Sequence, residues 1–180
     1  MTITFVTGNQ GKYNEIAVII PGLEMLKLDL DEIQGLDPRP IIEHKLQQAS
    51  QSYPGALIVE DTSLMFNCLN GLPGTNIKWF EQCLSNSQLA DLVSRYDDHS
   101  AIARSTIGYR DEQGKVKFFT GEITGNIVPP RGTLNPFGWN NIFQPDGHQQ
   151  TFAEMTISEK NHISMRGQAA HALQAYLAAK

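Results

Sequence analysis

The first part of the chain changes its hydrophobic pattern at a glycine loop. Residues Thr2–Val6 form a short run rich in β-branched and aromatic side chains, which predicts a strand. The polar segment Thr7–Gly11 interrupts this pattern, and Lys12–Ile20 is compatible with a helix that ends at Pro21-Gly22. This region is therefore predicted to run from a strand through a glycine loop into a helix.

A second strand and helix follow, and then a strand of different character. Met25–Leu28 is apolar enough for a strand, and apolar residues recur at helical spacing between positions 42 and 49. Ala56–Val59 shows no alternation, which is typical of a strand covered on both faces in a mostly parallel sheet. Glu60 and Asp61 are then expected at the carboxyl end of this strand.

The rest of the chain combines helical segments with one long hairpin. Two helices are expected, one at Asn76–Cys83 and one at Ser87–Tyr96 that is capped by Ser87. Two hairpin strands are expected at Ala101–Arg110 and Lys115–Ile127. An irregular section follows at Pro129–Pro136, and a terminal helix is expected at Met165–Ala179. Thr156 and Glu159 have the spacing of a capping box, which predicts a short helix after them. The mixture indicates an α/β fold.

Composition narrows the class of protein. The 180 residues are expected to form one domain, 1–180, and the net charge of -5 argues against a partner that is a nucleic acid polymer. Cys68 and Cys83 lack the spacing of a zinc site or a disulfide framework. No apolar run is long enough to span a membrane, and no signal peptide is evident, so a cytoplasmic location is expected.

The loop after the first strand has the composition of an anion site. A glycine-containing turn that enters a helix exposes backbone N–H groups and the positive end of the helix dipole to a phosphate, and Lys12 adds a charge. The spacing of Gly8, Gly11 and Lys12 matches neither a P-loop nor a dinucleotide-binding fingerprint. A tight turn that needs glycine for its backbone angles is an equally good interpretation.

Acidic residues near the predicted sheet edge suggest a metal site. Asp61 and Glu60 follow a buried strand, where an open α/β sheet usually binds its ligand, and a carboxylate there can hold Mg²⁺. Glu32 is a second candidate ligand from the acidic stretch that begins at Asp29. The alternative is that these acids are simply solvated.

Five cations fall near predicted loops or helix ends: Lys12, Lys45, Lys78, Lys160 and Arg166. If these five side chains converge, the chain presents a basic pocket to a triphosphate although its net charge is negative. The spacing of the five residues along the sequence alone favours the alternative, in which they are scattered over the surface. Phe137 and Trp139 flank Gly138 and could stack a base, although loop aromatics more often bury apolar surface.

Taken together, a series of short motifs resembles one known family. In order, they are Thr7-Gly8-Asn9 with Lys12 and Glu15, Val59-Glu60-Asp61-Thr62, Gly71-Leu72-Pro73-Gly74, Ile77-Lys78-Trp79-Phe80, Phe137-Gly138-Trp139, Phe143-Gln144-Pro145-Asp146-Gly147, Thr151-Phe152-Ala153-Glu154-Met155, Glu159-Lys160-Asn161 and Arg166. The chain resembles the inosine triphosphate pyrophosphatase family along nearly its whole length.

The resemblance implies a fold and a reaction. The fold is an elongated α/β structure with a central mixed sheet and flanking helices that form two lobes around a nucleotide cleft. The reaction is Mg²⁺-dependent hydrolysis of non-canonical purine nucleoside triphosphates (ITP, dITP and XTP) to a monophosphate and pyrophosphate. The resemblance also implies a homodimer.

The resemblance assigns roles to individual residues. Asp61 is the catalytic proton acceptor, and Glu32 and Asp61 are the metal ligands. The substrate-binding residues are Thr7, Gly8, Asn9, Lys12, Lys45, Thr62, Lys78, Phe137, Gly138, Trp139, Asn140, Lys160, Met165 and Arg166. Of these, the aromatic segment matches the base pocket, and the lysines match phosphate or nucleotide contacts.

Two positions depart from the family pattern. Asn140 stands where an aspartate is usual, and Met165 stands where a histidine is usual. A thioether cannot donate a hydrogen bond to the 6-oxygen of a purine, as a histidine can. A pyrophosphatase with altered base preference and a non-catalytic nucleotide-binding relative are therefore the alternatives to the family reaction.

Overall fold

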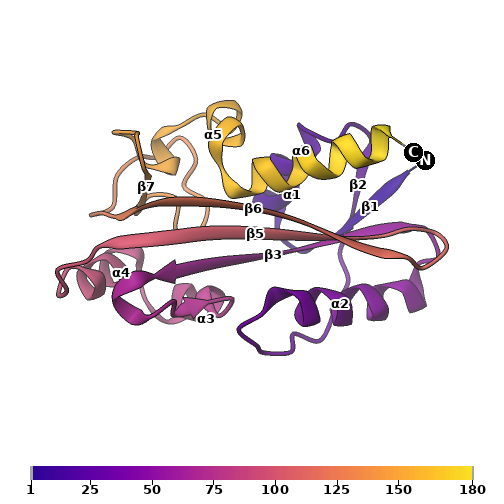
Figure 1. The fold of residues 1–180 in the computed structure, drawn as a ribbon, viewed down its shortest axis with the longest axis horizontal. Helices are drawn as coiled ribbons and strands as arrows, with labels where there is room; N and C mark the ends of the chain where they lie inside the picture. The colour runs from indigo at the N-terminus through magenta and orange to yellow at the C-terminus, as the bar shows by residue number, and fades with distance from the viewer. Residues whose placement is uncertain (1, 180) are drawn as a thin grey trace.

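The computed structural model describes residues 2–179 and is built on one mixed β-sheet (Figure 1). The strands are β1 (Ile3–Val6), β2 (Leu23–Leu26), β3 (Ala56–Phe66), β4 (Pro73–Gly74), β5 (Ser100–Arg110), β6 (Val116–Ile127) and β7 (Phe143–Pro145). Their order is β2-β1-β3-β5-β6-β7, with β4 paired to β3. β1 is parallel to β2 and β3, and every other pairing is antiparallel, which confirms the predicted α/β class with a central mixed sheet.

Helices cover both faces of the sheet. They are α1 (Gln10–Ala17), α2 (Pro38–Ser52), α3 (Ile77–Cys83), α4 (Asn86–Val93), α5 (Ile157–Ile163) and α6 (Met165–Ala178), with short 3-10 turns at Asn67–Leu69 and Phe152–Glu154. In Figure 1, α1, α5 and α6 lie on one side of the long strands, and α2, α3 and α4 lie on the other. None of the described helices is long and apolar enough to cross a membrane.

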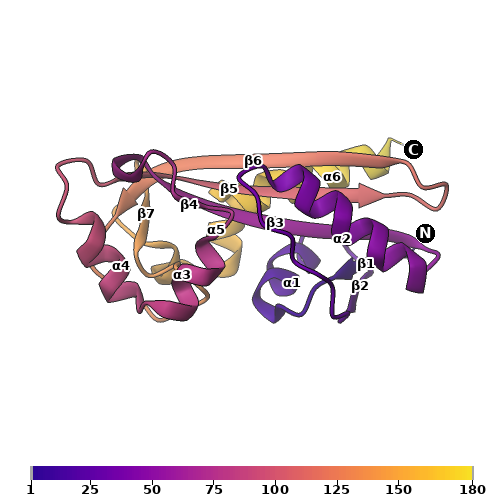
Figure 2. The same cartoon turned by 90° about the horizontal axis from the view of Figure 1, so that it is seen from below.

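The long strands β3, β5 and β6 connect two lobes. Figure 2 shows β1, β2 and α1 gathered toward one end of these strands and α3, α4 and β7 toward the other. Each lobe has its own apolar cluster, one around Ile16 and Leu173 and the other around Leu89, Phe143 and Phe152. A third cluster lies around Ile42 and Leu46. Because the clusters are separate, the region between the lobes is free to hold polar side chains.

Strand β3 runs further than its apolar segment predicts. The prediction that it ends near Val59 is wrong, because β3 continues to Phe66 through antiparallel pairs with β5. The pairs with β5 satisfy the backbone hydrogen bonds of the polar residues in this part of β3, which a prediction from hydrophobicity alone places outside the strand. Glu60 and Asp61 therefore lie in the middle of a strand instead of at its end.

One edge of β3 is partly uncovered because β1 and β4, its partners on that edge, are short. β1 pairs with β3 only as far as Ile58, and β4 begins to pair at Leu64. Between these two positions no strand of the described chain covers that edge of β3. This uncovered edge lies between the lobes and carries Glu60, Asp61 and Thr62.

Helix starts depend on capping side chains. The predicted cap Ser87 is wrong: α4 begins after Ser85, whose side chain and Gln88 form a reciprocal capping box. The capping box between Thr156 and Glu159 is confirmed at the start of α5. Ser85 and Ser87 are both residues that commonly cap a helix, so the sequence alone left the start of α4 ambiguous.

Two further boundaries differ by two residues. β2 covers Leu23–Leu26 instead of Met25–Leu28, because it pairs in register with β1 from Leu23 onward. α1 begins at Gln10 instead of Lys12, because the side chain of Asn9 accepts a hydrogen bond from the Lys12 backbone and caps the helix.

Candidate active site

One cavity of about 1010 Å³ lies at the open edge of β3 and takes its walls from both lobes. It brings together nearly every residue singled out from the sequence: Thr7, Gly8, Asn9, Lys12, Glu32, Lys45, Asp61, Thr62, Lys78, Phe137, Gly138, Trp139, Asn140, Met165 and Arg166. Lys160 is not among its lining residues. Segments from both ends of the chain thus meet at one site, and the expectation of scattered cations is wrong.

The N-terminus of α1 opens toward this cavity. Thr7 Oγ1 accepts a hydrogen bond from the backbone of Asn9 (3.0 Å), and Asn9 Oδ1 accepts one from the backbone of Lys12 (3.1 Å). Neither Gly8 nor Gly11 has a positive φ, so the interpretation as a turn that needs glycine for its backbone angles is wrong. A Cβ on Gly8 would meet no atom within 4 Å, so this stretch of backbone is open to a ligand.

Gly11 serves a packing purpose instead. A Cβ at this position would lie 2.6 Å from the ring of Phe137, which comes from the other lobe. Only a glycine therefore lets the first turn of α1 pack against Phe137. This contact places the predicted phosphate loop beside the predicted base pocket.

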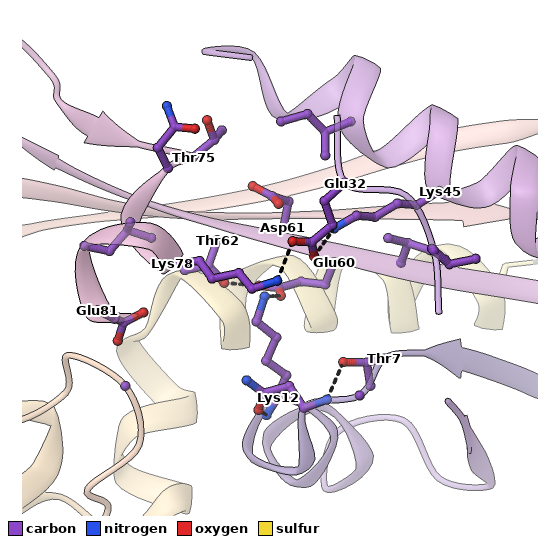
Figure 3. Close-up of a pocket in the computed structure, with 18 of the residues that line it drawn as sticks. Thr7, Lys12, Glu32, Lys45, Glu60, Asp61, Thr62, Thr75, Lys78 and Glu81 are labelled. Carbon is purple, nitrogen blue, oxygen red and sulfur yellow. Dashed lines mark hydrogen bonds and ion pairs between the residues drawn. The ribbon is translucent and has the colours of Figure 1, made fainter. Parts of the chain in front are cut away.

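Asp61 presents a carboxylate oxygen without a partner. Its Oδ2 is buried and has no hydrogen-bond partner in the described part of the chain. Burial raises the pKa of Asp61 to about 6, and the negative charges of Glu60 and Glu32 add to this effect while Lys12 and Lys45 oppose it. Figure 3 shows its side chain beside those of Glu32 and Lys45. A free carboxylate with a pKa near neutrality is suited to accepting a proton or holding a cation.

The raised pKa predicts that Asp61 destabilises the metal-free protein. The folded chain holds the Asp61 proton more tightly than the unfolded chain, for which the ordinary value is 3.8. Stability is therefore lost as pH rises from about 3.8 to about 6, and the full loss, about 3 kcal/mol at most, is present at neutral pH. Asp61→Asn should raise the free energy of unfolding in urea at pH 7.5 and should have little effect at pH 3. An equal effect at both pH values would contradict this origin of the pKa shift.

Glu60, next to Asp61, has an ion pair at each of its carboxylate oxygens. Lys12 Nζ lies 2.7 Å and Arg166 Nη2 lies 3.2 Å from its carboxylate oxygens, and Ser105 Oγ donates to it at 2.5 Å. Burial alone would raise the pKa of Glu60, but Arg166 and Lys12 hold it well below its usual range. The sequence pointed to the acidic pair and assigned a role only to Asp61. Strand alternation sends the two side chains in opposite directions, but which of them is paired depends on the approach of Lys12 and Arg166.

Glu32 links two of the predicted phosphate-binding lysines. Lys45 Nζ lies 3.0 Å from Glu32 Oε1, and Lys78 pairs with the other carboxylate oxygen (Figure 3). Burial acts to raise the pKa of Glu32, but hydrogen bonds from Lys78 and Lys45 lower it below the ordinary value. The loop that carries Glu32 also contacts α3 through Gln34, which accepts a hydrogen bond from the indole of Trp79 at 2.9 Å.

A buried ionic network lies behind the cavity wall. Lys160 Nζ lies 2.7 Å from Glu15 Oε1 and donates to Asn140 Oδ1 at 2.9 Å, while Arg166 Nη1 lies 2.5 Å from Glu15 Oε2. Burial lowers the pKa of Lys160 to about 8, although Glu15 opposes this shift. Glu15 was part of the family motif without an assigned role, and here it is the anion that neutralises two buried cations.

The aromatic segment is divided between two environments. Trp139 is buried in the core of its lobe, with ring centroids 5.5 Å from Phe143 and 6.4 Å from Phe152. Phe137 is half-buried, and its ring lies 5.7 Å from both Lys160 Nζ and Arg166 Cζ. Trp139 thus fits the interpretation as an anchor, and Phe137 presents the ring that is available to the cavity.

The charge of the cavity differs from the expected basic pocket. Among the described residues that line it, Lys12, Lys45, Lys78 and Arg166 are cationic, whereas six are acidic: Asp29, Asp31, Glu32, Glu60, Asp61 and Glu81. The expectation of a basic pocket is wrong, because the cations converge together with their counter-ions. A polyanion entering this cavity needs additional positive charge.

The fold and the cavity define a class of protein: a two-lobed α/β protein whose cleft joins a helix N-terminus, several lysines and a free carboxylate. The chain belongs to the Ham1 family, whose model matches residues 3–176. It is 43% identical over 185 residues to the inosine triphosphate pyrophosphatase of Kluyveromyces lactis, covering 97% of this chain and 95% of that protein. It is 44% identical over 181 residues to the protein of the same name from Pyricularia oryzae, covering 98% and 94%.

Solved structures share the fold. A HAM1 protein from Coxiella burnetii superimposes with a TM-score of 0.85 over the whole of both chains, at 24% identity. The Ham1 protein of Staphylococcus aureus gives a TM-score of 0.78, also at 24% identity, over 99% of both chains. The resemblance inferred from the motifs is thereby confirmed at the level of family and fold.

Proposed function

We propose that this chain hydrolyses the triphosphates of deaminated purine nucleosides, ITP, dITP and XTP, to the monophosphate and pyrophosphate. Its relatives in yeast and fungi carry the name inosine triphosphate pyrophosphatase. The observation that carries the proposal is the free, buried Oδ2 of Asp61 in the same cavity as the start of α1 and three lysines. This combination supplies both a proton acceptor and a binding site for phosphates.

The phosphates bind where cations and backbone N–H groups meet. Gly8 and Asn9 place the positive end of α1 at the cavity, and Lys12, Lys45 and Lys78 line the adjoining wall. Each lysine is held by Glu60 or Glu32 before the substrate arrives, so its position is fixed in advance. Phosphate oxygens then compete with these carboxylates for the same ammonium groups.

The donor set fits a divalent cation, and we infer Mg²⁺. Asp61 has an oxygen with no other partner, and Glu32, whose two oxygens pair with Lys45 and Lys78, lies in the same cavity. No three His, Cys, Asp or Glu side chains of the described chain are grouped closely enough to hold a metal ion by themselves. Mg²⁺ typically uses one or two carboxylates and completes its shell with water and substrate phosphates, so Asp61 and Glu32 would hold it together with the triphosphate. When bound, it would neutralise charge on the phosphate oxygens.

Asp61 acts on the attacking water. The water loses a proton to the carboxylate as its oxygen forms a bond to the α-phosphorus and the bond to the bridging oxygen breaks, which releases pyrophosphate. A general base works best when its pKa lies near the operating pH. Burial raises the pKa of Asp61 to about 6 in the chain without a bound cation, and a cation held by the same carboxylate would lower it. The lysines stabilise charge that develops on the phosphate oxygens.

The base lies at the other end of the cavity, against the ring of Phe137. Gly138, Trp139, Asn140 and Met165 complete this end. Asn140 donates from Nδ2 to the backbone of Asn135 (3.1 Å) and accepts from Lys160, so its carboxamide is committed to the protein. Lys160 thus acts on the base end through Asn140 instead of through the cavity surface.

A substrate panel tests the proposal. Pyrophosphate release should be measured with ITP, dITP, XTP and the four standard ribonucleoside triphosphates, with Mg²⁺ and with EDTA. We expect turnover of the deaminated purine nucleotides only when Mg²⁺ is present. Binding of ITP by calorimetry without any turnover would favour the non-catalytic alternative raised by Asn140 and Met165.

A homodimer and a cytoplasmic location stay predictions. Sedimentation velocity at micromolar concentration measures the first: a single species of twice the 20.0 kDa chain mass is expected. Sedimentation as the monomer at all concentrations would contradict it.

A further inference from the structure

Glu81 is a carboxylate of the cavity that the proposed reaction does not use. It lies on α3 and lines the cavity, and Figure 3 shows it apart from Glu32, Asp61 and Lys45. Within the described chain its carboxylate has neither a hydrogen bond nor an ion pair, and burial raises its pKa. A partly buried acid without a protein partner requires a ligand or water to satisfy it.

The position of Glu81 places it at the base end. A Cβ on Gly138 would lie 3.0 Å from Glu81 Oε1, so the missing side chain at Gly138 leaves the room that this carboxylate occupies. The charge of Lys12 acts to lower the pKa of Glu81, but no ion pair joins Glu81 to Lys12, Lys45 or Lys78, and its carboxylate would repel a triphosphate. Glu81 therefore belongs beside Gly138, at the base end of the cavity, instead of among the phosphate contacts.

Neighbouring polar groups at this end are already engaged. Both ends of the Asn140 carboxamide are hydrogen-bonded within the protein, and the carbonyl of Gly138 accepts from Asn86 Nδ2 at 2.9 Å. Met165 offers only a thioether, which is a weak acceptor. Glu81 is thus a strong acceptor at the base end that is free to meet a ligand.

We propose that Glu81 selects the base by accepting a hydrogen bond from the N1–H of a 6-oxopurine; this inference rests on the proposed function. Hypoxanthine presents N1–H next to a carbon that bears only hydrogen. Xanthine presents a carbonyl oxygen beside the same N1–H, and adenine has an acceptor at N1, so both bring an acceptor toward the carboxylate. Glu81 therefore favours ITP over XTP and ATP, whereas guanine, with a second donor beside N1–H, must be excluded by other contacts.

Variants of Glu81 test this assignment through substrate ratios. We expect Glu81→Leu to lower the ratio of kcat/KM for ITP to that for XTP by about tenfold or more, because a charged acceptor is lost for one base and a repulsion is removed for the other. Glu81→Gln, which keeps the shape, should shift the ratio in the same direction, because its amide can donate to the xanthine carbonyl. Glu43→Leu, at an exposed acid of α2 that does not line the cavity, should leave the ratio unchanged.

Binding measurements separate this inference from the proposed reaction. Calorimetry with IMP and XMP should show tighter binding of IMP to the unmodified chain and a reduced preference in Glu81→Leu and Glu81→Gln. If no triphosphate is hydrolysed but this preference is present and depends on Glu81, the proposed reaction fails and the role of Glu81 stands. If triphosphates are hydrolysed and neither Glu81 variant changes the ITP to XTP ratio, the role of Glu81 is overturned.

Discussion

Asp61→Asn should reduce kcat for ITP hydrolysis by about a thousandfold while the protein remains folded. The substitution keeps the shape of the side chain but removes the proton acceptor, and loss of a general base typically costs 10²- to 10⁴-fold in rate. It also removes the free anionic oxygen proposed to hold the cation. Pyrophosphate release under saturating Mg²⁺ and ITP measures the effect, and circular dichroism verifies the fold.

A matched acid on the surface controls for this substitution. Asp91 lies exposed on α4 and does not line the cavity, so Asp91→Asn should hydrolyse ITP at the rate of the unmodified chain. If Asp61→Asn retains a rate within about threefold of the unmodified chain, Asp61 has no part in the chemical step. The expected combination of lost activity and gained stability at pH 7.5 distinguishes a functional carboxylate from a structural one.

Glu15→Gln should lower the free energy of unfolding by about 3–5 kcal/mol at pH 7. Glu15 is the buried anion between Lys160 and Arg166, and breaking a buried ion pair by removing one partner leaves uncompensated charge in a low-dielectric interior. The amide keeps the volume of the side chain, so the loss of stability measures the effect of the removed charge and not the effect of a cavity. Urea denaturation followed by fluorescence measures it.

A surface ion pair provides the comparison. Glu122 pairs with Arg104 on neighbouring strands, and both side chains are substantially exposed, at 46% and 35%. Glu122→Gln should therefore cost less than about 1 kcal/mol. A loss below about 1 kcal/mol for Glu15→Gln as well would show that Lys160 and Arg166 are neutralised by other groups.

The elements of the fold follow largely from local sequence. The hairpin of β5 and β6, the terminal helix α6 and the capping box of α5 were predicted from alternation, periodicity and capping residues. The predicted end of β3 was wrong because the second half of this strand is held by pairing with β5, whose paired residues lie 35 to 47 positions away in sequence. Local pattern has no access to such partners.

The family motifs predicted many of the residues that line the cavity before any geometry was known. They did not reveal the charge of the cavity, because a lysine in the sequence does not show that Glu60 or Glu32 lies against it. They also left Glu81 unnoticed, since nothing local distinguishes it from a solvated helix residue. Its significance arises from its closeness to Gly138, which is distant in sequence.

The amino-acid sequence by itself determined the family, the α/β class and the candidate acid and lysines, because these depend on motif order and on short-range periodicity. Only the tertiary structure decided which carboxylates are neutralised and which are free. Glu60 and Asp61 are neighbours in sequence with opposite environments, since burial and the approach of Lys12 and Arg166 depend on distances through space. Electrostatic roles in a cleft are set by such distances, and a linear order of residues does not contain them.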